Sequence, residues 1–174
     1  MKSNVQTLQI ITWVLIISAA SILLNDINEF RLNRFIQFQD WAATANPDKP
    51  ISFKENFMEW AYYSLTVAMF VVRGFLIYAF THFLTILGEI EKGNYYGIKV
   101  SDSFKKVGSA FISYTIGLVV VQTISAFTLK NDFSFIQLFK TELTYLIPAA
   151  IGFFILAELF KQAQTLKDEN DLTI

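Results

Sequence analysis

One basic residue, Arg73, lies inside a long apolar run of the chain. On insertion scales an arginine at the centre of a membrane costs about 2.5–3.5 kcal/mol, so it is expected to face the interior of a helix bundle. There it could hold an anionic or polar ligand or make a gating contact. The alternative is a structural arginine that binds backbone carbonyls or reaches the interface. No acidic residue lies at matching depth, so polar groups are its expected neighbours. The candidate intramembrane polar site consists of Arg73, His82, Tyr114 and Gln122.

His82 is the single histidine of the chain, which has no cysteine. A zinc site needs three or four such ligands, so neither a metal nor a cofactor is expected. The chain also lacks the His-Glu-x-x-His, Gly-x-Ser-x-Gly and phosphate-binding loop motifs, so an enzyme is not expected. His82 is expected to make a hydrogen bond between helices.

Four long apolar runs must position these side chains, at about residues 7–24, 60–87, 108–127 and 143–160. At 1.5 Å per residue, each run is long enough to cross a hydrocarbon core about 30 Å thick. Helices of a soluble bundle would carry a polar stripe, whereas these runs are apolar all round. The sequence therefore predicts an all-α polytopic membrane protein. Its four transmembrane helices form one bundle in contact with the lipid bilayer, as a single membrane domain over residues 1–174.

The charge and composition exclude several other classes of protein. Hydrophobic residues make up 53% of the chain, charged residues 17%, and the net charge is −1. A disordered chain would be less hydrophobic, and a disulfide scaffold would need cysteines. A chain without excess positive charge is not expected to bind nucleic acid directly.

The segments between the runs predict the orientation. They comprise an extended outer loop over residues 25–59, a loop over 88–107 and a tail over 161–174 that is expected to contain a short helix. The side that holds both termini has seven lysines, four of them within 88–107, and the other side has six basic residues, four of them spread over the longer loop. Because short basic loops face the cytoplasm, we expect both termini, loop 88–107 and the tail to be cytoplasmic.

Small residues recur every four positions on the third run, at Ser109, Ser113 and Gly117. This spacing lets the backbone of a neighbouring helix approach closely, so the three residues predict a helix-packing face. The neighbouring helix could belong to the same chain or to another, which leaves a homo-oligomer open.

Two segments together resemble one protein family. The first, LGEIEKGNYYGIKVSDSFKKVG, contains Gly93, an aromatic residue three positions later (Tyr96), a stretch expected as a short helix with the basic pair Lys105-Lys106, and a closing Gly108. The second is the C-terminal stretch ELFKQAQTLKDENDLTI. Both resemble a bacterial family of small four-span membrane proteins, domain-of-unknown-function family 2975. Gly93 is also the expected end of a helix, followed by a turn.

The resemblance implies a protein of the bacterial inner membrane without established catalytic activity. Ala163 and Tyr96 stand where Gly and Phe are usual in the family, which leaves the architecture unchanged. Members are often encoded beside a small helix-turn-helix regulator of the Xre/Cro type, which implies binding or sequestration of that cytoplasmic regulator. A DNA-binding domain presents a basic surface, and the tail of this chain is acidic with apolar residues at its end. The candidate partner-binding residues are Lys105, Lys106, Asp168, Glu169, Asp171, Leu172 and Ile174.

Three alternatives stand beside this hypothesis. The tail could pack on the neighbouring loop instead of on a partner. The chain could be a ligand-binding or transport-related module that uses Arg73 in the bundle interior. It could also be a structural or immunity-type partner of another membrane protein, bound through the face of Ser109, Ser113 and Gly117.

Overall fold

The structure is a computed structural model that describes residues 2–29, 55–127 and 142–171. Within these ranges the chain forms helices and no strand, which confirms the predicted all-α bundle of four helices. Most of the predicted outer loop, residues 30–54, lies outside the described residues. The helices are α1 (Lys2–Glu29), α3 (Glu55–Glu91), α4 (Ile98–Ser125) and α6 (Glu142–Asp171).

All four helices are long and apolar enough to cross a membrane. In α3 the apolar stretch from Trp60 to Glu91 rises about 46 Å, close to the thickness of about 40–45 Å that a bilayer has with its interfacial regions. Exposed aromatic residues flank this stretch, with Trp60 at its start and Tyr95 and Tyr96 just after its end. Tyrosine and tryptophan favour the membrane–water interface, so the fold fits a multi-pass membrane protein.

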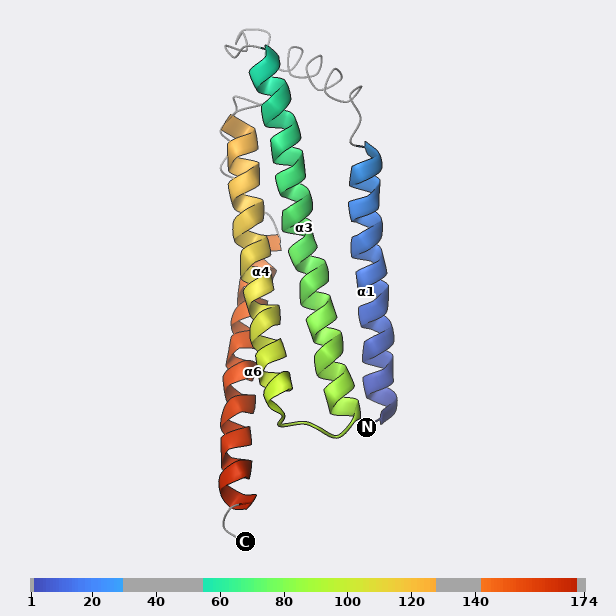
Figure 1. The fold of residues 1–174 in the computed structure, drawn as a ribbon, viewed down its shortest axis with the longest axis vertical. Coiled ribbons are helices and arrows are strands. Elements are labelled where there is room, and N and C mark those ends of the chain that lie inside the picture. The colour runs from blue at the N-terminus through green and yellow to red at the C-terminus, as the bar shows by residue number, and fades with distance from the viewer. Residues whose placement is uncertain (1, 30–54, 128–141, 172–174) are drawn as a thin grey trace.

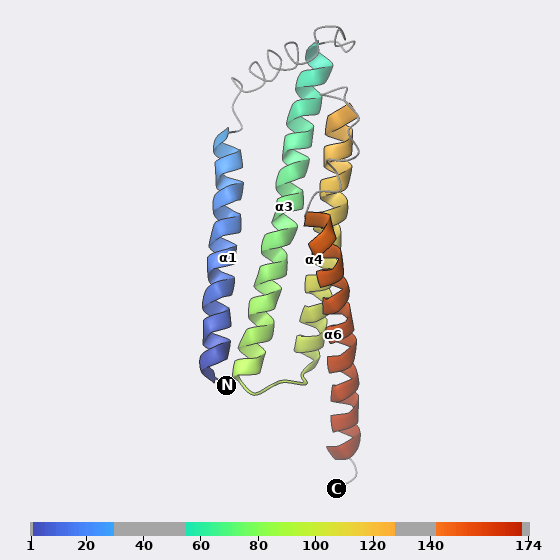
Figure 2. The same ribbon diagram turned by 180° about the vertical axis from the view of Figure 1, so that it is seen from behind.

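The helices lie side by side in the order α1, α3, α4 and α6: α1 packs on α3, α3 on α4, and α4 on α6. Figures 1 and 2 show α1 and α6 at opposite edges of the bundle. The start of α1, the connection between α3 and α4 and the end of α6 lie at the same end of the molecule, which we call the turn end (Figure 1). The first helix therefore begins on the side where the last helix finishes.

The core is centred on α4. Within an 18-residue apolar window of each helix, 44% of the residues are buried in α4, against 11% in α3 and α6 and 6% in α1. None of the described side chains of α1 belongs to the main buried cluster, and those that are buried are Val5 and Thr12. Three helices thus form the core, and α1 lies at its edge. The buried cluster consists of Ala79, Ile86, Val100, Phe104, Val107, Ala110, Phe111, Ala150 and Ala157.

Glycines let α4 approach both of its neighbours. A Cβ atom at Gly108 would lie 3.0 Å from the carbonyl oxygen of Ala150 in α6. A Cβ atom at Gly117 would lie 2.6 Å from the Cγ2 atom of Val72 in α3. Because lipid removes most of the hydrophobic drive between helices, close packing of this kind is what holds membrane helices together.

The segment 88–107, predicted as a loop, is mostly helical, and residues 92–97 alone separate α3 from α4. The reason is packing. Val100 and Phe104 are buried, and the Ser101 hydroxyl donates a hydrogen bond of 2.8 Å to the carbonyl oxygen of Ala157 in α6. Apolar residues three to four positions apart form one face of a helix, and the lysines on its other faces give this segment the composition of a loop.

The close approach at Gly117 gives a first testable prediction. The Gly117→Ala methyl group would meet Val72, and a valine in a helix has essentially one favourable rotamer, so the two helices must separate. We expect the free energy of unfolding to fall by about 1–3 kcal/mol, as measured by unfolding of the detergent-solubilised protein.

Gly152→Ala in α6 is the matched control, because no atom lies within 4 Å of the added methyl group. It should leave packing intact and raise stability by up to about 1 kcal/mol through helix propensity. Equal effects of the two substitutions would contradict close contact between α3 and α4 at Gly117.

Candidate functional site

Arg73 lies half-buried on α3, at a level where α3 and α4 are in close contact. Its Nη1 atom is buried from solvent. The preceding residue, Val72, forms a small buried cluster with Leu118 and Val121 of α4, and Tyr114 packs against this cluster. Tyr114 therefore lies beside the turn of α3 that carries Arg73.

His82 and Gln122 do not join Arg73. His82 follows Arg73 by nine residues, which in an α-helix corresponds to half a turn of rotation and a rise of about 13 Å. Its ring packs edge-on against Tyr78 of the same helix, with 4.5 Å between ring centroids. Gln122 is exposed on α4. Of the four predicted polar residues, the structure thus places Tyr114 near Arg73 and the other two elsewhere. The described ranges contain no group of three or more His, Cys, Asp or Glu residues that could hold a metal.

The three small residues of α4 have different surroundings. Gly117 meets α3 of the same chain, Ser113 is half-buried and Ser109 is exposed. Contact of Ser109 with another chain stays a prediction. The close contact of α4 with α6 at Gly108 was not predicted. Its signal in the sequence is a pair of alanines, Ala150 and Ala157, whose seven-residue spacing places them on one face of α6.

The turn between α3 and α4 has a fixed backbone. Gly93 has a φ of +81°, a left-handed conformation that glycine adopts without steric cost. Its N–H group donates to the carbonyl oxygen of Ile90 at 3.0 Å, and the N–H group of Asn94 donates to that of Glu89 at 2.9 Å. These bonds form a Schellman motif, which confirms the predicted helix end at Gly93.

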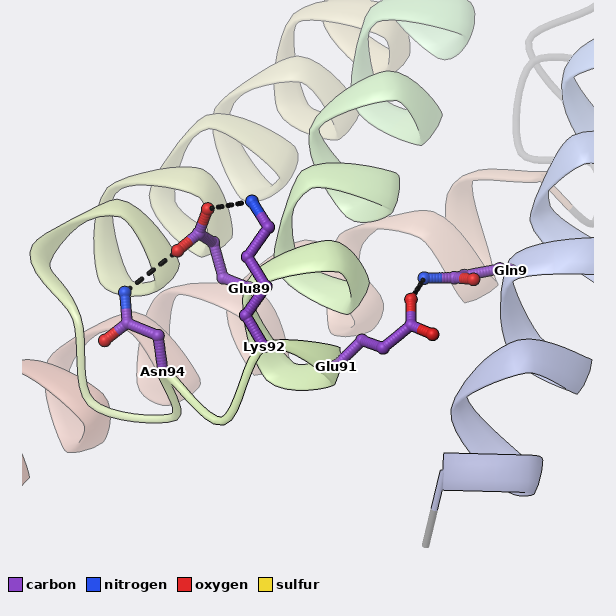
Figure 3. Close-up of polar contacts among 5 residues, drawn as sticks. All are labelled: Gln9, Glu89, Glu91, Lys92 and Asn94. Atoms are coloured by element: carbon purple, nitrogen blue, oxygen red, sulfur yellow. Dashed lines mark hydrogen bonds and ion pairs between the residues drawn. The ribbon is translucent and has the colours of Figure 1, made fainter.

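Side chains hold the same turn, as Figure 3 shows. The carboxylate of Glu89 accepts hydrogen bonds from Asn94 Nδ2 at 2.9 Å and from Lys92 Nζ at 3.2 Å. Glu91 accepts a hydrogen bond of 3.0 Å from Nε2 of Gln9 in α1 (Figure 3). The two acidic residues at the end of α3 therefore hold the turn and join α1 to α3.

The predicted partner-binding residues lie on two helices. Lys105 is exposed on α4, and the Nζ atom of Lys106 lies 2.7 Å from the carboxylate of Asp102, one turn earlier. Asp168 and Glu169 are exposed near the end of α6. Asp171 is the last residue of α6, and Leu172 and Ile174 lie outside the described residues.

The basic pair and the acidic residues do not form one surface. The hydrogen bond between Ser101 and Ala157 places these two residues at the same level of α4 and α6. From this shared level, Lys105 lies one helical turn farther from the turn end of the molecule. Asp168 lies three helical turns in the opposite direction, past the turn end. Lys105 and Asp168 are therefore separated by about 22 Å along the bundle.

The last part of α6 projects past the other helices. The ring of Phe160 stacks on Phe104 with 5.1 Å between centroids and lies 6.2 Å from the ring of Tyr96 in the turn. Phe160 is thus level with the turn. From Lys161 to Asp171 the helix continues for about 15 Å, as its red end in Figure 1 shows.

Aromatic rings fix α6 on its neighbours from this level inward. Phe153 of α6 lies 6.1 Å from Phe104, 5.6 Å from Phe111 and 6.0 Å from Phe83, measured between ring centroids. Each such pair contributes about 0.5–1.5 kcal/mol beyond the burial of its area. The projecting segment therefore extends from a firmly packed base.

The family comparison agrees with this architecture. The sequence model of a family described as "Protein of unknown function (DUF2975)" matches residues 50–174. The chain belongs to this family. The match confirms the resemblance drawn from the sequence. The part of the chain that matches the DUF2975 model contains all of α3, α4 and α6. No curated protein and no solved structure matches the chain.

The ring stack gives a second prediction. Phe104→Ala removes the ring that links Phe153 and Phe160, so we expect the free energy of unfolding to fall by about 3–5 kcal/mol. Leu166→Ala, at a position of α6 that is 65% exposed, is the control for the loss of a large apolar side chain, and it should cost less than about 1 kcal/mol. Thermal unfolding in detergent measures both, and similar losses would contradict the importance of the stack.

The bond between Gln9 and Glu91 gives a third prediction. In a Val5→Cys variant the introduced thiol is the only one in the chain, at a position of α1 that is 7% exposed. Adding Gln9→Ala should raise its rate of maleimide labelling about threefold, since an exposed hydrogen bond of this kind contributes about 0.5–1 kcal/mol. Gln6→Ala, at an exposed position one turn earlier, should leave the rate unchanged. An equal labelling rate of Val5→Cys with and without Gln9→Ala would show that this hydrogen bond does not hold α1 against α3.

Proposed function

We propose that this protein binds a small helix-turn-helix transcription regulator and holds it at the bacterial inner membrane. In this proposal the turn end faces the cytoplasm, and the regulator docks on the projecting end of α6. The observation that carries the proposal is this exposed helical extension, about 15 Å long, on a firmly packed base. The role is binding and regulatory, without catalysis.

The charges near the turn end support the orientation. Lys92, Lys99 and Lys105 are exposed at or near the turn. Basic residues close to the ends of transmembrane helices favour the cytoplasmic side. The regulator would then meet the protein in the compartment where its DNA lies.

The chemistry of the projecting segment supports the type of partner. After Lys167 the segment carries Asp168, Glu169 and Asp171, so its end is acidic. A DNA-binding domain has a basic surface that binds the phosphates of DNA, and an acidic helix can bind to the same surface in their place. The resemblance to the DUF2975 family supports the same partner, since its members are often encoded beside a small regulator of the Xre/Cro type.

Removal of residues 168–174 tests the proposal directly. The full chain and the truncated chain are each co-expressed with a small helix-turn-helix regulator of the Xre/Cro type, and membranes are separated from cytosol by centrifugation. We expect the regulator to sediment with membranes that contain the full chain and to stay in the cytosol with the truncated chain. Equal sedimentation with both chains would contradict docking on the end of α6.

Charge removal without truncation makes the test sharper. The double variant Asp168→Asn, Glu169→Gln keeps the size of both side chains and removes two exposed charges. At about 0.5 kcal/mol for each exposed ion pair, we expect about fivefold weaker binding of the regulator to the purified protein. The control is Gln162→Ala, Thr165→Ala, two exposed uncharged positions of the same segment, which should leave binding unchanged.

A further inference from the structure

A cavity of about 140 Å³ lies where α1 meets the three core helices. One side is formed by apolar residues of α1 together with Thr12, and the opposite side by aromatic rings of the core. These rings belong to three different helices. They are Phe80 and Phe83 of α3, Phe111 of α4 and Phe153 of α6.

The lining selects an apolar occupant. Thr12 is the one polar side chain among the lining residues, and its hydroxyl donates a hydrogen bond of 2.7 Å to the carbonyl oxygen of Leu8 within α1. None of the described residues that line the cavity is charged. Apolar cavities of about 150 Å³ in proteins stay dry and bind hydrocarbons such as benzene.

The cavity is open on the side of α1. Leu8, Ile11 and Leu15 line it and yet remain 45%, 50% and 43% exposed. Next to them on α1, Ile10, which is 65% exposed, extends the same apolar surface outward. An occupant can therefore enter between α1 and the core without passing a polar barrier.

The depth of the cavity decides what surrounds this opening. Phe83 lies eight residues before Glu91, about 12 Å from the end of α3 at the turn. In a membrane whose hydrocarbon core is about 30 Å thick, this level is occupied by the acyl chains of lipids. At this depth the available apolar molecule is a lipid chain.

We propose that the cavity binds one hydrocarbon chain of a membrane lipid, inserted between α1 and the aromatic wall of the core. The ring of Phe153 packs edge-on against the rings of Phe83 and Phe111, so the wall is preformed, while α1 lies at the edge of the core and can adjust to the chain. This site is independent of partner binding at the end of α6.

Photolabelling in a bilayer tests the site. The full chain is reconstituted into nanodiscs of phosphatidylcholine that carries a diazirine in the middle of one acyl chain. After irradiation and digestion, mass spectrometry locates the labelled residues. We expect labels on Phe83, Phe111 or Phe153 in addition to the exposed Ile17 of α1. Labels on Ile17 with none on these rings would overturn the proposal.

A pair of neighbouring substitutions isolates the cavity. Ile11→Trp fills it from the side of α1, whereas Ile10→Trp places the same ring outside it. We expect Ile11→Trp to reduce labelling of the three rings at least fivefold and Ile10→Trp to leave it unchanged, with labelling of Ile17 retained in both. Equal ring labelling in the two variants would overturn the proposal. Should Ile11→Trp fail to give a monodisperse protein, Leu15→Trp fills the same cavity one turn away and is judged by the same criterion.

Discussion

The arrangement of the other core helices depends on how closely α4 can approach its two neighbours, α3 and α6. Inside a bilayer the lipid is as apolar as the helix surfaces, so association relies on close packing and on a few interhelical hydrogen bonds. Gly117 and Gly108 supply the close packing on the two sides of α4, and Ser101 supplies a hydrogen bond to α6. The aromatic rings of α3, α4 and α6 then fill the space that this spacing leaves between the helices.

α1 is attached in a different way from the other helices. Among its described side chains, Val5 and Thr12 are buried, and Gln9 donates a hydrogen bond to Glu91 of α3. The range matched by the family model begins at residue 50, so it contains the three core helices and not α1. The packed unit and the matched range therefore coincide in the described part of the chain. The cavity lies between this unit and α1.

The sequence predicts the elements of this fold well and their mutual rotation poorly. The apolar runs are long and free of polar stripes, so the four helices could be identified, and Gly93 correctly marked the end of α3. The third span was expected to begin at residue 108, after a short helix, whereas α4 begins at Ile98 as one continuous helix. The lysines on the outer faces of residues 98–107 conceal the buried Val100 and Phe104. The nine-residue spacing of Arg73 and His82 in a helix already places them half a turn apart, so His82 could have been excluded from the polar set. Which face of α4 meets α3, and so whether Tyr114 or Gln122 lies near Arg73, could not be derived from composition. Contacts such as Gly108 with Ala150 depend on that rotation.

The projecting end of α6 also separates the electric field of its acidic residues from that of the lysines of α4. At physiological ionic strength the field of a charge is screened over about 8 Å, and Asp168 lies about 22 Å along the bundle from Lys105. The acidic end of the helix is therefore not neutralised by the lysines of α4, nor is a partner near it attracted to them. An anionic membrane surface at the level of the turn is likewise screened from it. The seven helical residues 161–167 thus separate the acidic end of α6 from the level of the turn, which lets one short chain present opposite charges to the membrane and to the solution.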